Sequence, residues 1–255
     1  MVLNAIEAGQ GAPVILLHGL FGSARSLGVV QRALARRFRA IALDLRNHGA
    51  SPHAAEMAYQ AMAADVLETL EYLGALPAAL IGHSMGGKTA MLLALTRPDA
   101  VTRLLVADIA PVPYVHDNDR IVRALLAVPL TPGLTRAAAD SALVDAVPDA
   151  SMRAFLLQNL AFGERPRWRI GLPEIAAAIP TLEGWDGPHG LTYAGPTLFV
   201  SGARSDYVRP DDRPAIRGVF PRARFVTLKD AGHWLHADNP KGFVAVVEAF
   251  MASGR

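Results

Sequence analysis

The pentapeptide Gly82-His83-Ser84-Met85-Gly86 constrains the fold of this chain more than any other stretch. An apolar run, Ala78 to Ile81, precedes it, and a run of small and apolar residues, Gly87 to Leu95, follows it. Gly-x-Ser-x-Gly between a strand and a helix is typical of a tight turn that presents a nucleophilic serine. Side chains at both flanking positions would collide in such a turn, and glycine avoids the collision. The helix would also direct its positive end toward the serine. The flanking pattern favours a nucleophile at Ser84 over a chance pentapeptide.

Short apolar runs alternate with amphipathic segments on both sides of this turn. We expect strands at residues 2–6, 14–17, 40–43, 78–81, 101–107, 197–200 and 224–228. We expect helices at residues 26–38, 62–73, 87–95 and 240–251, from apolar residues at helical spacing. This alternation predicts the α/β class, with a mostly parallel sheet and helices on both faces.

The pattern changes between residues 111 and 195. Helices are expected at 120–128, 136–147 and 152–162, separated by proline and glycine, with no convincing strand. We therefore predict a core of residues 1–110 and 196–255, and a helical cap of residues 111–195 inserted after the strand that ends at Asp108. The alternative is a helical elaboration of the core with no role at the site.

Composition excludes several classes of function. The 255 residues, 51% of them hydrophobic, suffice for one full core. The net charge is only +2 and the basic residues are scattered, so no nucleic-acid partner is expected. The absence of cysteine excludes disulfides and thiolate metal sites. Nothing indicates a cofactor, a metal, a signal peptide or a membrane span, so we expect a cytoplasmic protein without a membrane partner. The oligomeric state is left open.

A serine nucleophile needs a base, and the base needs an acid to orient it. His233 lies in the loop between the last expected strand and the last expected helix, which returns to the carboxyl ends of the strands. His236 is its neighbouring competitor, but the glycine before His233 allows a bend toward Ser84. The acid is either Asp108 or Asp206, since each follows an expected strand.

The whole chain resembles the α/β-hydrolase superfamily, and more closely the YbfF-type esterases and their mitochondrial abhydrolase relatives. The blocks that carry the resemblance are His18-Gly19-Leu20-Phe21-Gly22-Ser23, Asp44-Leu45-Arg46-Asn47-His48-Gly49, Ser51-Pro52, the pentapeptide with Gly87-Lys88, Asp108-Ile109-Ala110-Pro111-Val112, and Gly232-His233-Trp234. The resemblance implies that Asp108 is the acid and that Ser205 also faces the histidine. Asp206 is then a turn residue that bonds its own backbone.

The negative oxygen of a tetrahedral intermediate needs two backbone N–H donors. One is expected from Met85, directly after the nucleophile. The other is expected from the loop after His18-Gly19, with Leu20 favoured over Phe21.

Several other side chains are given structural interpretations. Arg46, Asn47 and His48 are expected to brace their loop. Three arginines could meet an anionic leaving group or form a solvated edge of the cap, and three aromatic residues could line the acyl pocket or the interior of the cap. The arginines are Arg165, Arg167 and Arg169, and the aromatic residues are Phe162, Trp168 and Trp185.

These features predict a serine hydrolase that cleaves carboxylic esters or acyl thioesters through an acyl-enzyme on Ser84. The resemblance, rather than residue spacing, implies small to medium acyl groups, so the expected partner is a small-molecule acyl ester or thioester. Carbon–carbon bond hydrolysis, lactone hydrolysis and acyl transfer use the same three residue types and remain alternatives. A ligand-binding receptor that retains them is a further alternative. Dehalogenases and epoxide hydrolases need a carboxylate at position 84, which Ser84 excludes.

Overall fold

The computed structural model describes residues 1–114 and 117–253. Residues 115–116 of the expected cap and residues 254–255 of the expected core lie outside this description.

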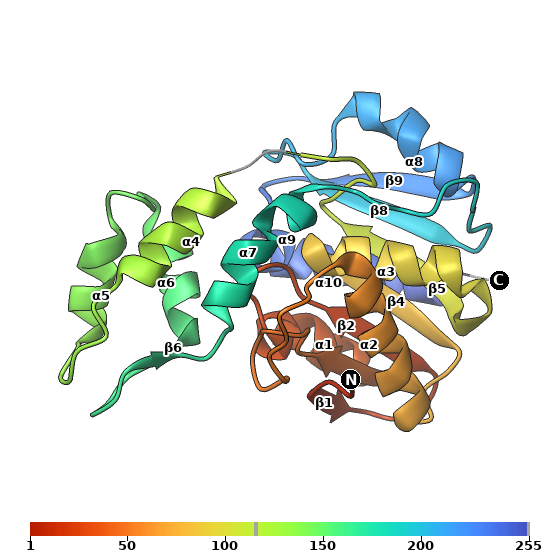
Figure 1. The fold of residues 1–255 in the computed structure, drawn as a ribbon. Coiled ribbons are helices and arrows are strands. Elements are labelled where there is room, and N and C mark those ends of the chain that lie inside the picture. Colours follow the sequence, from red (N-terminus) through yellow and green to blue (C-terminus); the bar gives the residue numbers. More distant parts are fainter. Residues whose placement is uncertain (115–116, 254–255) are drawn as a thin grey trace.

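A seven-stranded sheet forms the centre of the molecule (Figure 1). Its strands are β1 (Ala5–Ala8), β2 (Pro13–Leu17), β3 (Arg39–Leu43), β4 (Ala78–His83), β5 (Val101–Ala107), β8 (Thr197–Gly202) and β9 (Ala223–Leu228). They lie in the order β1-β3-β2-β4-β5-β8-β9, and only β1 is antiparallel to its neighbour. In the register, Leu17 pairs with Gly82, and His83 pairs with Ala107. The predicted α/β class and mostly parallel sheet are confirmed.

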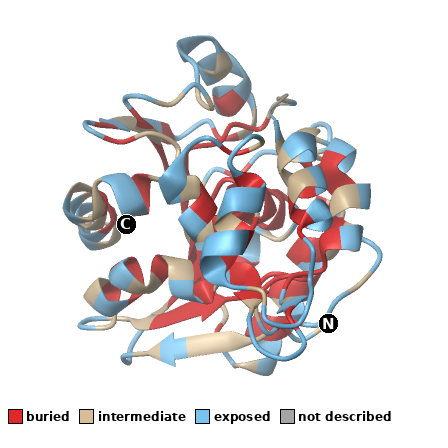
Figure 2. Cartoon of the chain, turned by 90° about the vertical axis from the view of Figure 1, so that its left-hand side faces the viewer, coloured by how far each residue is buried: buried red, intermediate tan, exposed pale blue. Residues whose placement is uncertain are grey.

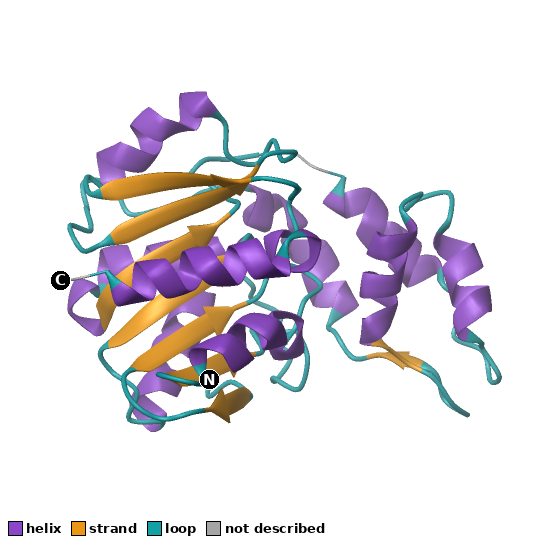
Figure 3. Cartoon of the chain, turned by 180° about the vertical axis from the view of Figure 1, so that it is seen from behind, coloured by secondary structure: helices purple, strands orange, loops and turns teal. Residues whose placement is uncertain are grey.

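Helices cover both faces of the sheet. On one face lie α1 (Gly28–Leu34) and α10 (Pro240–Ala252), which are in front in Figure 3. On the other lie α2 (Tyr59–Tyr72), α3 (Met85–Thr96) and α8 (Arg213–Val219). Figure 2 shows that buried residues gather in the sheet and on the inner sides of these helices. All six residues of β4 are buried, which is why its sequence is nearly continuously apolar.

The remaining short helical elements join these layers. They are α9 (Leu235–Asp238) and the 3₁₀ turns Ala24–Leu27, Pro98–Ala100 and Pro210–Asp212, while a further 3₁₀ turn, Leu157–Asn159, lies within residues 111–195.

The first strand begins later than expected, at Ala5 instead of Val2. The Leu3 N–H donates to Thr69 Oγ1 at 2.9 Å, and the Asn4 N–H donates to Ser51 Oγ at 2.8 Å. Because side chains take these backbone donors, the segment packs on α2 and its neighbouring loop before it joins the sheet.

The described part of residues 111–195, called here the helical segment, is mostly helical. It contains α4 (Asn118–Ala127), α5 (Arg136–Leu143), α6 (Ala150–Leu156) and α7 (Leu172–Glu183). Figure 3 shows that the strands point toward the side of the molecule on which α4, α5 and α6 lie. In Figure 1, α7 lies between these helices and the core. The helical segment is therefore next to the carboxyl ends of the parallel strands.

Two expectations for this segment were incomplete. A short antiparallel pair, β6 (Leu160–Ala161) and β7 (Arg167–Trp168), replaces the end of the helix expected at 152–162. The helix α7 was missed because it contains Pro173 and Pro180, and proline is unfavourable inside a helix. Pro173 is tolerated because it lies in the first turn, whose N–H groups have no intrahelical acceptor.

Candidate active site

Ser84 lies between β4 and α3 in a strained backbone conformation, with φ 51° and ψ −118°. A Cβ atom at Gly82 would lie 2.3 Å from the Gly86 carbonyl oxygen, and one at Gly86 would lie 2.4 Å from the Leu17 carbonyl oxygen. No side chain fits at either position. The Ser84 N–H donates to the carbonyl of Ala107 on β5 at 3.0 Å. The expected turn is therefore present, and neighbouring backbone explains both glycines.

Asp108 directly follows β5 and is fully buried. Its Oδ1 accepts the Gly202 N–H at 3.0 Å, and its Oδ2 lies 2.8 Å from Nδ1 of His233. The Ser205 hydroxyl donates to the same Oδ2. The structure thus brings Asp108, Ser205 and His233 together. A carboxylate beside Nδ1 favours the tautomer with the proton on that nitrogen, which leaves the lone pair on Nε2.

His83, the residue before Ser84, contacts His233. Its Nε2 lies 2.8 Å from the His233 carbonyl oxygen, and the two ring centroids are 4.7 Å apart. Burial lowers the pKa of His83 well below its ordinary value, so the ring is neutral and donates from Nε2. This bond holds the His233 backbone beside the turn that carries Ser84.

The two alternatives from the sequence lie in different surroundings. Asp206 is exposed, and its carbonyl accepts Arg209 Nε at 3.3 Å. His236 is buried with its ring 5.0 Å from that of His83, and burial lowers its pKa to about 4. The arrangement favours the pair His233 and Asp108 over either alternative.

The candidate oxyanion donors border Ser84 from two sides. Met85 is the first residue of α3, where backbone N–H groups lack an intrahelical acceptor. On the other side, a Cβ atom at Gly19 would lie only 3.2 Å from Ser84 Cβ, so the loop that carries Leu20 and Phe21 runs against the nucleophile. The Phe21 N–H already donates to His48 Nε2 at 3.2 Å. That bond favours Leu20 as the second donor.

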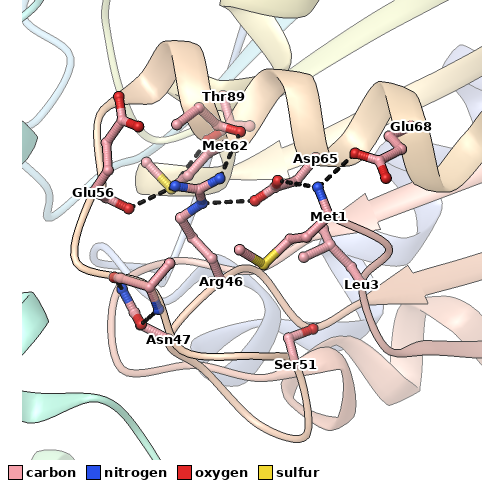
Figure 4. Close-up of polar contacts among 12 residues, drawn as sticks. Met1, Leu3, Arg46, Asn47, Ser51, Glu56, Met62, Asp65, Glu68 and Thr89 are labelled. Carbon is pink, nitrogen blue, oxygen red and sulfur yellow. Dashed lines mark hydrogen bonds and ion pairs between the residues drawn. The ribbon is translucent and has the colours of Figure 1, made fainter.

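The loop of Arg46, Asn47 and His48 is held by its own hydrogen bonds, as Figure 4 shows for the first two residues. Arg46 Nε donates to the buried Asp65 at 2.6 Å, and its Nη1 donates to the Glu56 carbonyl at 2.6 Å. His48 Nδ1 lies 2.9 Å from the Arg46 carbonyl, and burial lowers the pKa of His48 to about 3. His48 is therefore neutral and accepts the Phe21 N–H, which connects this bracing loop to the loop beside Ser84.

Two aromatic residues near His233 were not singled out from the sequence. The Tyr207 ring stacks on the His233 imidazole, with centroids 3.6 Å apart and an interplanar angle of 17°. Phe155 of α6 packs against Trp234, with centroids 4.4 Å apart. Tyr207 could have been selected from the sequence, because it lies two residues after Ser205, which was already a candidate site residue. Helical spacing alone does not distinguish Phe155 from an interior residue of the segment.

The side chains proposed for an acyl pocket or an anion differ in exposure. Phe162 is exposed, Trp168 lies half-buried in β7, and Trp185 is half-buried with its ring 6.4 Å from that of Tyr59. Arg165, Arg167 and Arg169 are all exposed. A cavity of about 570 Å³ is lined by residues of the core loops and of the helical segment, among them Phe21, Asp44, Asn159 and Arg169, while Ser84 and His233 are not part of its lining.

Residues 1–114 and 117–253 contain neither a metal-binding cluster nor a membrane-spanning helix. There, no three histidine, aspartate or glutamate side chains group closely enough to hold a metal ion. In the same ranges, no helix has the length and apolar character needed to cross a membrane. The cytoplasmic location expected from the sequence stays a prediction.

A parallel sheet with a serine at a strained strand–helix turn, beside a histidine–carboxylate pair, defines a hydrolase of the α/β type. The model of the alpha/beta hydrolase fold family matches residues 12–240, and the chain belongs to this family.

Similar proteins include esterases and lipases. The sn-1-specific diacylglycerol lipase ABHD11 of Mus musculus is 41% identical, over 98% of this chain and 84% of that protein. Esterase YbfF of Escherichia coli (strain K12) is 36% identical, over 95% of this chain and 94% of the esterase. The solved structure of a marine microorganism esterase has a TM-score of 0.93 and 36% identity, and covers 98% of this chain and 99% of that one. The predicted resemblance to YbfF-type esterases and their abhydrolase relatives is confirmed.

Proposed function

We propose that this enzyme hydrolyses carboxylic esters through an acyl-enzyme formed on Ser84. The observation that carries the proposal is the 2.8 Å contact between His233 Nδ1 and the buried Asp108, located beside the strained turn of Ser84. The relatives named esterase and diacylglycerol lipase support the same chemistry.

In the proposed reaction, Ser84 Oγ attacks the ester carbonyl while its proton passes to His233 Nε2. Asp108 keeps the other proton on Nδ1 and stabilises the imidazolium that forms. His233 then returns the proton to the leaving alkoxide. Water attacks the acyl group by the same route, the carboxylic acid leaves, and Ser84 regains its proton.

Backbone N–H groups would stabilise the negative oxygen of each tetrahedral intermediate. We assign this role to Met85 and Leu20, because the Phe21 N–H is occupied by His48. Ser205 adds a hydrogen bond to Asp108 Oδ2, which holds the carboxylate that orients His233.

We further propose that residues 111–195 act as a cap that selects the acyl group. Their place next to the carboxyl ends of the strands supports this role. Small to medium acyl esters and acyl thioesters are the proposed substrates. The name of the mouse relative adds diacylglycerols to the substrates that deserve testing.

Replacing Ser84 with alanine tests the nucleophile. We expect Ser84→Ala to abolish labelling by a fluorophosphonate. The remaining turnover should exceed the uncatalysed reaction in water by only about 10³–10⁴-fold, which is the acceleration that substrate binding and the backbone donors supply without the nucleophile. The measurement is kcat/KM on acetyl and butyryl esters, with circular dichroism to confirm folding. Near-normal turnover in folded Ser84→Ala would end the serine-hydrolase assignment.

A substrate panel separates ester hydrolysis from lactone hydrolysis, acyl transfer and ligand binding without turnover. It contains graded acyl esters, the matching acyl-CoA thioesters, lactones and a diacylglycerol, with water or an added alcohol as acceptor. Ester formation that outpaces hydrolysis would identify an acyltransferase. Labelling of Ser84 without turnover of any member would favour a ligand-binding receptor.

A further inference from the structure

Lys88 is a buried lysine on α3, four residues after Ser84, and the proposed chemistry does not use it. Its side chain has no exposed surface. A buried ammonium is unfavourable unless other groups replace the water that it loses. The contacts of Lys88 therefore indicate what it does.

The ammonium of Lys88 is directed at the carboxyl end of α7. Its Nζ donates to the carbonyl of Gly184, the residue directly after α7, at 2.5 Å. The ammonium also lies 4.3 Å from the ring centroid of Tyr114 and 5.6 Å from that of Tyr59. The last carbonyls of a helix lack intrahelical donors and form the negative end of its dipole. A cation from α3 therefore lies at the negative end of α7 and is hydrogen-bonded to the residue that follows this helix.

Two further donors hold the same helix end. The Tyr59 hydroxyl donates to the Leu182 carbonyl at 2.7 Å, and the Tyr114 N–H donates to the Glu183 carbonyl at 2.9 Å. Two carbonyls at the end of α7 and that of Gly184 directly after it thus accept hydrogen bonds from groups outside the helix. Among these groups, only Lys88 belongs to the helix that starts at the nucleophile.

The opposite end of α7 is also attached to the core. The N–H of Gly171, which precedes α7, donates to the Asn47 carbonyl at 2.9 Å. Both ends of α7 are therefore bound at the edge of the sheet, and Asn118 of α4 in turn donates to the Glu183 carboxylate at 3.1 Å. The placement of α7 relative to Ser84 depends on these attachments.

We propose that Lys88 is the positioning residue that holds α7 at a fixed place relative to Ser84, and that it thereby determines how well long acyl chains bind. This proposal rests on the proposed ester hydrolysis. The end of α7 is connected to the site by ring contacts, since the Lys88 ammonium lies over Tyr114, Tyr114 contacts Tyr207, and Tyr207 stacks on His233. We therefore expect a long acyl chain to reach α7, whereas an acetyl group ends near the carbonyl. A displaced α7 therefore weakens long-chain substrates more than short ones.

Replacing Lys88 with methionine tests the proposal. We expect Lys88→Met to lower the ratio of kcat/KM on an octanoyl ester to kcat/KM on an acetyl ester about tenfold, which is the effect of a small misfit in an apolar pocket. Amide hydrogen exchange in residues 172–184 should become faster. Lys241→Met, which alters an exposed lysine of α10, is the matched control and should change neither quantity. An unchanged ratio in folded Lys88→Met overturns the proposal.

The pH dependence of the unmodified enzyme gives a second test, which decides the question if Lys88→Met does not fold. Burial lowers the pKa of Lys88 to about 7, against the attraction of the Glu183 carboxylate. The other titratable groups that face it are Tyr59 and Tyr114, and burial raises the pKa of both, so they stay neutral here. As the pH rises from about 6 to about 9, Lys88 loses its charge and the octanoyl-to-acetyl ratio should fall. His233 has the same role in the hydrolysis of both esters, so its contribution cancels in the ratio.

A constant ratio across this pH range would also contradict the proposal. If the wild-type protein hydrolyses no ester at all, the proposed function fails instead. In that case hydrogen exchange in α7, compared between wild type and Lys88→Met, still decides whether Lys88 holds the helix.

Discussion

At the scale of single residues, the acid that orients His233 follows from hydrogen bonding. One oxygen of the Asp108 carboxylate accepts a hydrogen bond from the Gly202 N–H. The other accepts hydrogen bonds from His233 Nδ1 and the Ser205 hydroxyl. Asp206, one position further along the chain from Ser205, is exposed to solvent. Both aspartates follow a strand in the sequence, but it is Asp108 that contacts the histidine.

We expect Asp108→Asn to lower kcat/KM about 10⁴-fold, because an amide favours the wrong histidine tautomer and does not balance the imidazolium charge. Asp206→Asn is the control and should stay within about threefold, as for an exposed side chain. Ser205→Ala should fall between them, since it removes one hydrogen bond and no charge. The three variants are compared on one acetyl ester after circular dichroism confirms folding. A larger loss for Asp206→Asn would reverse the assignment.

At the scale of elements, the turn between β4 and α3 depends on close backbone contact. We expect Gly86→Ala to destabilise the protein by about 3 kcal/mol or more, because the added methyl group would lie 2.4 Å from the Leu17 carbonyl oxygen. Gly218→Ala on α8 is the control, since nothing lies within 4 Å of its added methyl group. It should stabilise the helix by about 0.5–1 kcal/mol. Urea unfolding measures both, and equal effects would contradict the steric explanation.

For the whole molecule, buried neutral histidines link stability to pH. Burial lowers the pKa of His18, His48, His83 and His236. Below the ordinary histidine pKa the unfolded chain therefore binds more protons than the folded one, and the unfolding free energy falls as the pH falls. For His236 this window lies between 6.5 and about 4.

We expect the unfolding free energy to fall by about 1.4 kcal/mol per pH unit for each such histidine once the pH drops below its unfolded pKa. His236→Phe should reduce this slope by the contribution of one histidine, because phenylalanine binds no proton. Phenylalanine also keeps a ring beside His83 and Trp234. Urea unfolding at a series of pH values below neutrality measures the slope for both proteins. An identical slope would mean that His236 does not titrate on unfolding.

The sequence by itself determined the features that depend on local sterics and on the periodicity of burial. The glycines around Ser84, the apolar runs of β2, β3, β4 and β5, and the position of Asp108 at a strand end all belong to this kind. Local propensity also explains why α7 was not predicted. Pro173 and Pro180 argue against a helix there, and tertiary contacts stabilise it nevertheless.

Only the tertiary structure decided which of these groups meet. The contact between Asp108 and His233 joins residues 125 positions apart, and the bond from Lys88 to Gly184 spans 96. The Phe21 N–H is bound by a histidine 27 positions away, which shifts the proposed oxyanion role to Leu20. Such pairings depend on how the strands order themselves across the sheet and how the helical segment packs beside them. Neither local propensity nor residue spacing contains that information, because the free energy of these contacts is realised only when distant parts of the chain pack together.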